Sequence, residues 1–227
     1  VAVQSVATGL DGNLSAGVML TWQSPSNGLD GTATIDAMIG GTDAETDASL
    51  LARLLDLIRR PPAGGNKYDY RRWALEVDGV SAAYVYPLRR GLGMVDVVIT
   101  SATGLPSAEI LAATQAYIDD VRPVTAKNAL VLAPTLRTLD HLVRIVPATG
   151  YTLATAMPLV SAAISDYFNS LAPGDTWVRS QLEKRISALD CVADRAVVTP
   201  ATNVAPVVDA TKVEWLRAGT ITVELLS

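Results

Sequence analysis

The stretch that decides the fold runs from residue 40 to residue 80 and reads GGTDAETDASLLARLLDLIRRPPAGGNKYDYRRWALEVDGV. Thr42 and Glu45 have the spacing of a capping box, in which two side chains satisfy the first free amides of a helix. Pro61-Pro62 ends such a helix, because proline lacks the amide proton that a continuing helix needs. The pattern therefore predicts a helix that begins at Thr42 and stops before Pro61. Its apolar face consists of Leu50, Leu51, Leu54, Leu55 and Ile58.

A second helix is predicted directly after the proline pair. Gly64-Gly65 lets the chain reverse, and Asn66 is a favoured N-cap residue. We expect this helix to run from Lys67 to Val77. The side chains expected to share one face are Tyr70, Ala74 and Val77, with Trp73 beside them. Residues 41–78 are thus predicted to form a helical pair joined by a short Pro/Gly loop.

The residues before this stretch read as strands. Apolar and polar side chains alternate over residues 18–23 and 33–39, as they do in half-buried strands, and Gly and Asn mark turns between them. Residues 1–40 are therefore predicted to be a β segment. The chain starts at Val1 inside a strand-like pattern, so we expect this segment to be the remainder of an N-terminal domain.

Two small α/β modules are predicted after the helical pair. The first, residues 79–135, has strands at 80–86, 94–100 and 130–133 and a helix at 107–121. The second, residues 136–227, has strands at 139–146, 192–199 and 219–225 and helices at 152–171 and 176–189. Pro158 should either kink its helix or mark the first turn. The predicted fold class is α+β: the β segment and helical pair, followed by two split βαβ-type modules.

The charge of the chain is unevenly distributed. The net charge is −5, which argues against a general nucleic-acid binder or a binder of anionic membranes. Residues 53–90 hold eight basic and four acidic side chains, so this segment carries +4 and the rest of the chain −9. Two readings stay open. The basic segment either docks against an acidic face of a partner or is ordinary solvated helix surface.

The residues that usually carry catalysis are scarce. His141 is the only histidine and lies in a strand pattern, so we interpret it as a sheet-face residue rather than part of a catalytic triad. Cys191 is the only cysteine, which excludes an intrachain disulfide and a Cys/His zinc site. The acidic cluster Asp43, Glu45 and Asp47 suits a helix N-terminus better than a calcium loop. We therefore predict no catalytic residues, no cofactor and no metal.

Aromatic and basic side chains gather in one segment. Tyr68, Tyr70 and Trp73 interleave with Arg71-Arg72, and Tyr84 and Tyr86 follow. This combination is typical of energetically important contacts at protein interfaces, although it also suits stacking on single-stranded nucleic acid. The net acidity favours a protein partner. The predicted interface residues are Arg59, Arg60, Tyr68, Tyr70, Arg71 and Arg72.

The same stretch resembles a known family. GGTDAETD at residues 40–47, RRPPAGGN at 59–66, Asp69-Tyr70 and Trp73-Ala74 are similar to motifs of the baseplate J-like family. Gly79-Val80, the strand through Tyr86-Pro87 and the Gly-Met-Val run at 93–95 continue the resemblance, which covers nearly the whole chain. The Mu-type subgroup is the most similar, and its members usually carry an additional N-terminal region.

The resemblance implies a function. It predicts a structural subunit of the wedge in a contractile-tail baseplate, located in the virion tail and assembled in the bacterial cytoplasm. The implied partners are other baseplate wedge proteins and further copies of the chain, with no nucleic acid and no membrane. Two alternatives remain open on the sequence: a tail-associated hydrolase with a scattered carboxylate site, and a receptor- or glycan-binding tail module.

Overall fold

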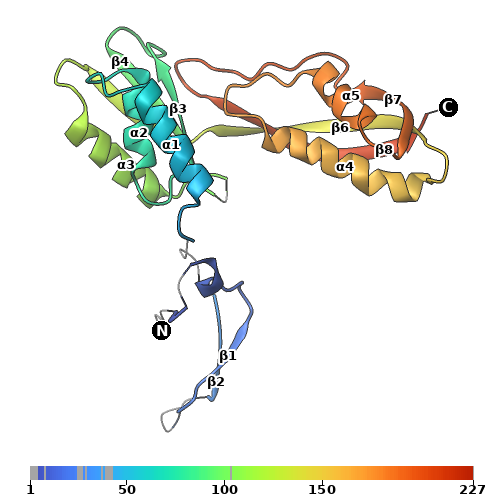
Figure 1. The fold of residues 1–227 in the computed structure, drawn as a ribbon, viewed down its shortest axis with the longest axis horizontal. Coiled ribbons are helices and arrows are strands. Elements are labelled where there is room, and N and C mark those ends of the chain that lie inside the picture. Colours follow the sequence, from blue (N-terminus) through green and yellow to red (C-terminus); the bar gives the residue numbers. More distant parts are fainter. Residues whose placement is uncertain are drawn as a thin grey trace. The chain divides into compact units, whose positions relative to one another are not determined.

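The computed structural model describes residues 5–7, 9–24, 28, 30–36, 38, 43–102 and 104–226. The chain divides into two compact units, Val1–Pro62 and Ala63–Ser227 (Figure 1). This boundary falls between the two helices that the sequence predicts as a pair. The prediction of four parts, at 1–40, 41–78, 79–135 and 136–227, is not tested by it and stays a prediction.

The first unit contains little regular structure. It has a short 3-10 helix, η1 (Leu10–Gly12), and an antiparallel ladder of β1 (Met19–Thr21) and β2 (Thr32–Thr34). Both strands are shorter than the alternating patterns that predict them, and Ala37 and Ile39 lie outside the described residues. Helix α1 (Asp47–Arg59) follows and stops before the proline pair, as predicted.

The predicted start of this helix is wrong. The N-cap is Thr46, whose hydroxyl accepts the Ser49 N–H at 3.2 Å, and the helix begins at Asp47. Glu45 accepts hydrogen bonds from the Ser49 hydroxyl and from the Arg53 guanidinium. Glu45 therefore supports the first turn from outside the helix, and Thr42 lies outside the described residues. Two hydroxyl residues compete for one cap here, and local spacing does not distinguish them.

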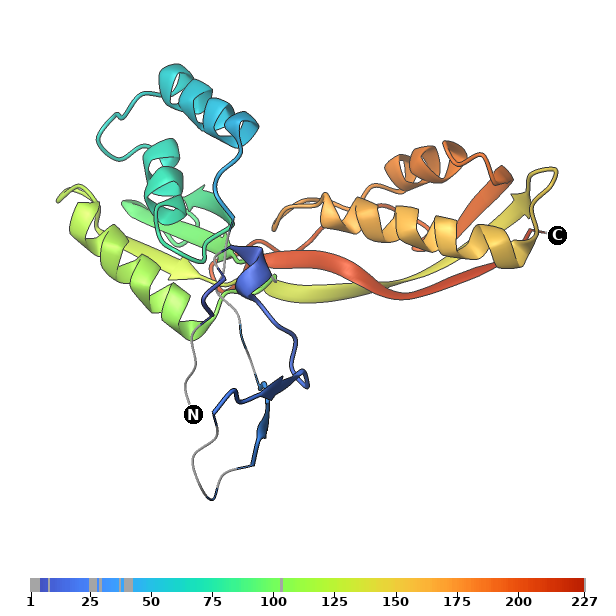
Figure 2. The same cartoon turned by 60° about the horizontal axis from the view of Figure 1, so that its bottom comes forward.

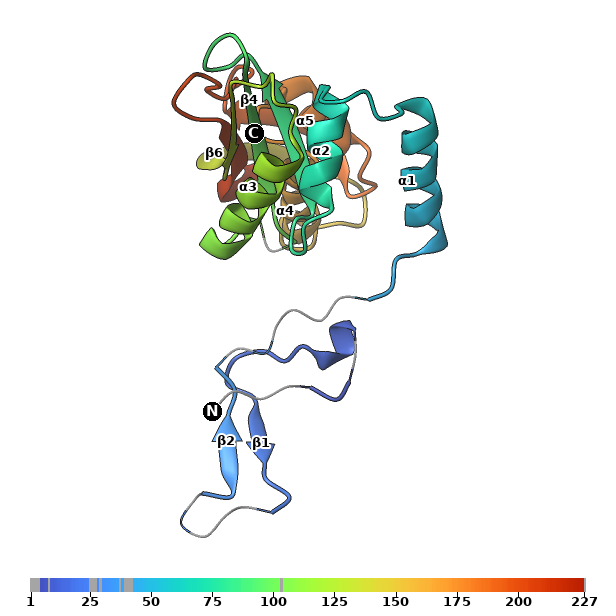
Figure 3. The ribbon, with the colours of Figure 1, turned by 90° about the vertical axis from the view of Figure 1, so that its left-hand side faces the viewer.

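The second unit begins with a three-stranded sheet in the order β3-β4-β5. Its elements are α2 (Lys67–Leu75), β3 (Ala82–Pro87), β4 (Met94–Thr100), α3 (Ala108–Val121) and β5 (Asn128–Leu132). Strands β3 and β4 are antiparallel, and β4 and β5 are parallel. Helices α2 and α3 lie side by side (Figure 3). They enclose a core with the sheet that includes Tyr70, Ala74, Val97, Ile99 and Ile118.

A second three-stranded sheet follows, in the order β7-β6-β8. Its elements are β6 (Thr135–Pro147), α4 (Leu153–Asn169), α5 (Arg179–Ser187), β7 (Val192–Thr199) and β8 (Glu214–Leu225). Strand β6 is antiparallel to β7 and parallel to β8. Helices α4 and α5 lie on the same face of this sheet (Figure 2). Its core includes Ile145, Val160, Phe168, Trp177 and Leu182.

The α+β class is confirmed, and the differences lie at element ends. Strands β6 and β8 begin at Thr135 and Glu214, earlier than predicted, because these residues pair with each other. Residues 135–138 read Thr-Leu-Arg-Thr, and one apolar side chain is too few to show the alternation by which a strand is recognised. Pro158 lies inside α4, beyond its first turn, while Thr152 caps the helix.

Candidate partner interface

Helix α2 is held in place by one buried carboxylate. Asp69 accepts backbone N–H groups from Ala63 at 3.0 Å, Gly65 at 2.8 Å and Asn66 at 3.2 Å, all on Oδ2. Its Oδ1 accepts the Arg72 guanidinium at 2.6 Å. Burial alone would raise the pKa of Asp69, but the three N–H donors and the Arg72 charge together lower it below its usual value. Asp69 therefore stays ionised and fixes the loop before α2.

Two of the six predicted interface residues lie on the inner side of this arrangement. Tyr70 is 1% exposed, and its ring packs edge-on against Trp73 with centroids 5.0 Å apart. Arg72 is engaged with Asp69, and its side chain is 28% exposed. The structure thus places Tyr70 in the core and Arg72 beside a buried anion. Both positions argue for a role in folding rather than in contact with a partner.

The outer side of α2 carries two cations and an aromatic ring. Lys67 and Arg71 are exposed, and Tyr68 is half-buried. The Lys67 ammonium lies 5.0 Å from the centre of the Tyr68 ring, within the range of a cation–π contact. Arg71 is therefore at the surface of the second unit and Tyr68 is partly so, and their contact with a partner stays a prediction.

Arg59 and Arg60 belong to the first unit, at the end of α1. Both are exposed, and Arg60 pairs with Asp56 one turn earlier at 2.6 Å. Salt bridges exposed to this degree contribute little to stability. The helix they terminate has no buried residue at all, and its large apolar side chains are 37–66% exposed. These side chains are Leu50, Leu51, Leu54, Leu55, Leu57 and Ile58.

A groove runs along β3 in the second unit. It has a volume of about 360 Å³, and its floor is formed by five consecutive residues, Ala82 to Tyr86. One wall is the outer side of α2, and the other is the loop of Ala172, Pro173 and Asp175. We call this hollow the β3 groove. It brings two of the predicted interface residues, Tyr68 and Arg71, together with a loop that is distant in sequence.

The floor of the β3 groove is joined to its loop wall at Tyr86. The Tyr86 hydroxyl donates a hydrogen bond to the Pro173 carbonyl. Burial, followed by the nearby Asp175 charge, raises the pKa of Tyr86 to about 12, so the phenol keeps its proton. Gly174 has φ +86°, and a Cβ there would lie 2.6 Å from the Tyr86 hydroxyl. Only glycine fits this loop against Tyr86 without displacement.

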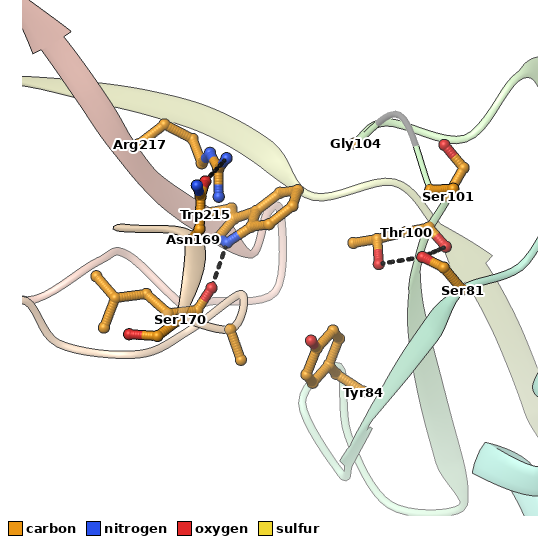
Figure 4. Close-up of a pocket in the computed structure, with 12 residues that line it drawn as sticks. Ser81, Tyr84, Thr100, Ser101, Gly104, Asn169, Ser170, Trp215 and Arg217 are labelled. Atoms are coloured by element: carbon orange, nitrogen blue, oxygen red, sulfur yellow. Dashed lines mark hydrogen bonds between the residues drawn. The ribbon is translucent and has the colours of Figure 1, made fainter. Parts of the chain in front are cut away.

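A second hollow of about 370 Å³ lies on the other side of Tyr84 (Figure 4). It is lined by polar side chains, among them Ser81, Thr100, Asn169 and Arg217. The Ser81 and Thr100 hydroxyls lie 3.4 Å apart, and Arg217 donates to the Asn169 amide oxygen at 2.7 Å. The lining residues include no carboxylate and no histidine. This hollow therefore lacks the paired acids on which the hydrolase alternative depends.

The structure confirms the interpretation of His141. It is 2% exposed in β6, and its Nδ1 lies 2.9 Å from the Leu139 carbonyl oxygen. Its ring is edge-on to Phe168 and Trp177, with centroids 5.0 and 5.3 Å away. Cys191 is also buried. Within the described part of the chain, no group of three or more potential metal ligands comes together.

Several groove residues were not among the predicted interface set. Lys67, Tyr84 and Tyr86 lie in the basic aromatic segment that the sequence already marks, so their proximity to Arg71 was within reach of sequence reasoning. Asp175 and its loop were not, because they follow α4, far along the chain. Only the tertiary contact between Tyr86 and Pro173 brings that loop to β3.

Comparison with known sequences identifies the class of protein. The Baseplate J-like central domain matches residues 62–133, and the Baseplate J-like protein C-terminal domain matches residues 142–224. These ranges coincide with the two sheets and their helices. The chain belongs to the baseplate J-like family, which confirms the resemblance seen in its sequence.

Three relatives define its position more closely. It is 32% identical to the Mu-like prophage FluMu protein gp47 of Haemophilus influenzae, over 95% of this chain and 64% of the relative. It is 28% identical to the baseplate protein gp47 of Escherichia phage Mu, over 97% of this chain and 63% of the relative. JayE of Escherichia coli is 30% identical, over 82% and 70% of the two chains. The chain thus spans less than two thirds of the length of either gp47 relative.

The fold is also seen among solved structures. A chain in the cryo-EM structure of the anti-feeding prophage baseplate has a TM-score of 0.55 and 15% identity, covering 90% of this chain and 49% of that one. At this identity the likeness concerns the fold alone. Separately, none of the helices in the described residues has the length and hydropathy to cross a bilayer.

Proposed function

We propose that this chain is a structural subunit of a contractile-tail baseplate, in a phage, a prophage or a related injection machine. In this proposal it works through contacts with other proteins, catalyses no reaction and resides in the tail baseplate after assembly in the bacterial cytoplasm. Its support is the family membership, together with the name of the phage Mu relative as a baseplate protein. The shared fold with a chain of the anti-feeding prophage baseplate agrees with it.

The observation that carries the proposal is the exposed apolar face of α1. A helix of 13 residues without one buried side chain gains little from its own packing, and exposed apolar patches of this kind mark surfaces that partners cover. Leu51 is 55% exposed and Leu54 50%. Asp47 in the first turn and Arg59 in the last turn match the dipole of the helix.

The proposed partners are other baseplate wedge proteins and further copies of this chain. The exposed face of α1 and the outer side of α2 are the surfaces offered to them. Arg59, Arg60, Tyr68 and Arg71 remain the proposed contact residues, whereas the positions of Tyr70 and Arg72 favour a folding role. The net charge of −5 supports protein partners rather than nucleic acid or an anionic membrane.

Co-purification with the neighbouring wedge proteins tests the function. The full-length protein would be co-expressed with the baseplate proteins encoded beside it and recovered through a tag. We expect a stable complex that is lost when Leu51 and Leu54 are both changed to glutamate. Lys127→Glu with Lys184→Glu adds two acids at exposed positions elsewhere and should leave the complex intact. A wild-type chain that binds none of these proteins would refute the proposal.

One observation favours a second candidate. The β3 groove is lined by three tyrosines, Tyr68, Tyr84 and Tyr86, and aromatic rings in a shallow groove also suit a sugar surface. A glycan-binding tail module would bind host polysaccharide without any wedge protein present. Measured binding of the isolated chain to purified host-surface glycans, lost in Tyr68→Ala, would favour this candidate over assembly.

A further inference from the structure

Strand β5 is an outer strand of its sheet, and one side chain covers its edge. The strand order is β3-β4-β5, so the β5 backbone pairs with β4 on one side only. On the other side Gln115, from helix α3, hydrogen-bonds directly to the strand. Its Nε2 donates to the Ala129 carbonyl at 3.0 Å, and its Oε1 accepts the Val131 N–H at 2.7 Å. The Gln115 amide therefore occupies two outward peptide groups of an edge strand.

These two hydrogen bonds have the pattern that a neighbouring strand would make. Peptide groups of alternate residues point to the same side of a strand, so those of Ala129 and Val131 face outward together. A residue of an adjacent parallel strand would donate to the carbonyl of the first and accept the N–H of the second. The side-chain amide of Gln115 does both, so it takes the place of one strand residue.

A carboxylate fixes the orientation of the Gln115 amide. Gln115 Nε2 also donates to Asp119 Oδ2 at 2.8 Å, one turn further along α3. Asp119 is in turn paired with Arg122, whose Nε lies 3.0 Å from Oδ1. Both neighbours of Nε2 accept hydrogen bonds, and the neighbour of Oε1 donates one, so exchanging the amide nitrogen and oxygen would break all three bonds. The amide is therefore held in the one orientation that matches the strand.

The sequence of β5 makes an uncovered edge a hazard. The strand reads Asn-Ala-Leu-Val-Leu, without a charge or a proline that would discourage pairing with another strand. Ala129 and Val131 are buried, whereas Asn128 and Leu130 are exposed. The strand itself therefore carries none of the usual protection of an edge, and the protection comes from α3.

We propose that Gln115 is an edge cap: an autoinhibitory contact that keeps β5 from pairing with the β5 strand of a second copy of the chain. Asp119 and Arg122 are positioning residues that act through Gln115. The inference goes beyond the proposed function and does not depend on it, because the cap closes this edge whichever surfaces the baseplate uses.

Removing the amide tests the cap on the 227-residue chain. Gln115→Ala deletes both bonds to β5, and the matched control is Gln181→Ala, which removes an exposed glutamine of α5. In Gln115→Ala we expect hydrogen exchange at the Val131 amide to be about tenfold faster or more, as the loss of one hydrogen bond implies. We also expect a larger mass in light scattering than for the wild type at the same concentration. The control should match the wild type in both measurements.

A peptide copy of the strand shows whether the uncovered edge pairs. The probe has the sequence of residues 127–133, KNALVLA, and a scrambled peptide of the same composition reports non-specific apolar binding. In fluorescence anisotropy, Gln115→Ala should bind the probe at least about tenfold more tightly than the wild type or Gln181→Ala does. The peptide reports on strand pairing even where copies of the chain associate through other surfaces.

A conservative variant keeps the test decisive if Gln115→Ala does not fold. In Gln115→Glu at neutral pH, the carboxylate has no proton to donate to the Ala129 carbonyl, and it lies beside the Asp119 carboxylate. Below about pH 4 the new glutamate gains a proton, so it can again donate to Ala129 and accept from Val131. We expect this variant to bind the probe peptide at pH 7 and to lose that binding in acid.

Three results would overturn the proposal. They are unchanged exchange at Val131 in Gln115→Ala, equal binding of the probe peptide by the wild type and Gln115→Ala, and binding by Gln115→Glu that is the same at both pH values. The co-purification experiment separates such a failure from a failure of the function. A chain that enters the wedge complex while its Gln115→Ala variant ignores the peptide loses only the edge cap, whereas a chain that binds no wedge protein loses the proposed function.

Discussion

Replacing Asp69 should lower the stability of the second unit more than replacing any exposed charged residue does. In Asp69→Asn one carboxylate oxygen becomes an amide nitrogen, which cannot accept both sets of donors that Asp69 serves. Either the three N–H groups at 2.8–3.2 Å or the Arg72 guanidinium at 2.6 Å must lose its acceptor. Leaving a buried donor unpaired costs about 1–3 kcal/mol, and more for a charged group, so we expect a loss of about 2–4 kcal/mol.

Urea unfolding followed by circular dichroism measures this loss. The matched control is Glu224→Gln, because Glu224 pairs with Arg144 at 3.1 Å while the two side chains are 47% and 43% exposed. That variant should change stability by less than about 0.5 kcal/mol. A loss in Asp69→Asn no larger than in the control would show that the carboxylate does not organise the loop.

The pH dependence provides a second test of the same residue. The pKa of Asp69 is lower in the folded than in the unfolded protein, so its stabilising effect is complete above the unfolded pKa, near 3.9. The effect is lost as the pH falls through the folded pKa. The difference in stability between wild type and Asp69→Asn should therefore shrink in acid. A difference that is constant with pH would contradict the role of ionisation.

Three further predictions concern other parts of the chain. Burial lowers the pKa of His141 in the folded protein, so as the pH falls the unfolded chain binds a proton at this residue before the folded chain does. The free energy of unfolding should therefore decrease as the pH drops below about 6.5. A His141→Asn variant should lose this pH dependence, and urea midpoints measured across that range would show it. Gly174→Ala should lower stability by about 1–3 kcal/mol in thermal unfolding, because its φ is +86° and its Cβ would collide with Tyr86. Leu51→Glu with Leu54→Glu should leave the urea midpoint nearly unchanged while removing the wedge complex, since both side chains are already exposed in the single chain.

Sequence reasoning recovers the elements whose signals are local. Asn66 caps α2 as predicted, and Ser107 and Thr152 cap the two longer helices that follow, close to their predicted starts. The first helix shows the limit, because Thr42 with Glu45 and Thr46 with Ser49 offer competing caps. Periodicity on α2 also separates its sides: Lys67 and Arg71 share the outer one, while Tyr70 and Ala74 share the inner one.

The features that could not be predicted from the sequence depend on contacts between residues far apart in the chain. The early parts of β6 and β8 are strands only because Thr135 and Glu214 meet across the sheet. The β3 groove likewise depends on Pro173 reaching Tyr86, a contact between residues that lie far apart in the chain. No pattern around either residue indicates it. The predicted interface residues therefore include Tyr68 and Arg71 on one wall of the groove and none on the other.

The connection between the two sheets is short. Only Ala133 and Pro134 separate β5 from β6, and Pro134 is buried with its φ restrained by the ring. Such a joint has almost no slack. We expect a pull on the far end of β6 or β8 to pass into the sheet of β3, β4 and β5, because only two residues lie between the two sheets. In the contractile baseplate that we propose, such a joint would convey movement between the two sheets, whereas a loose linker would dissipate it.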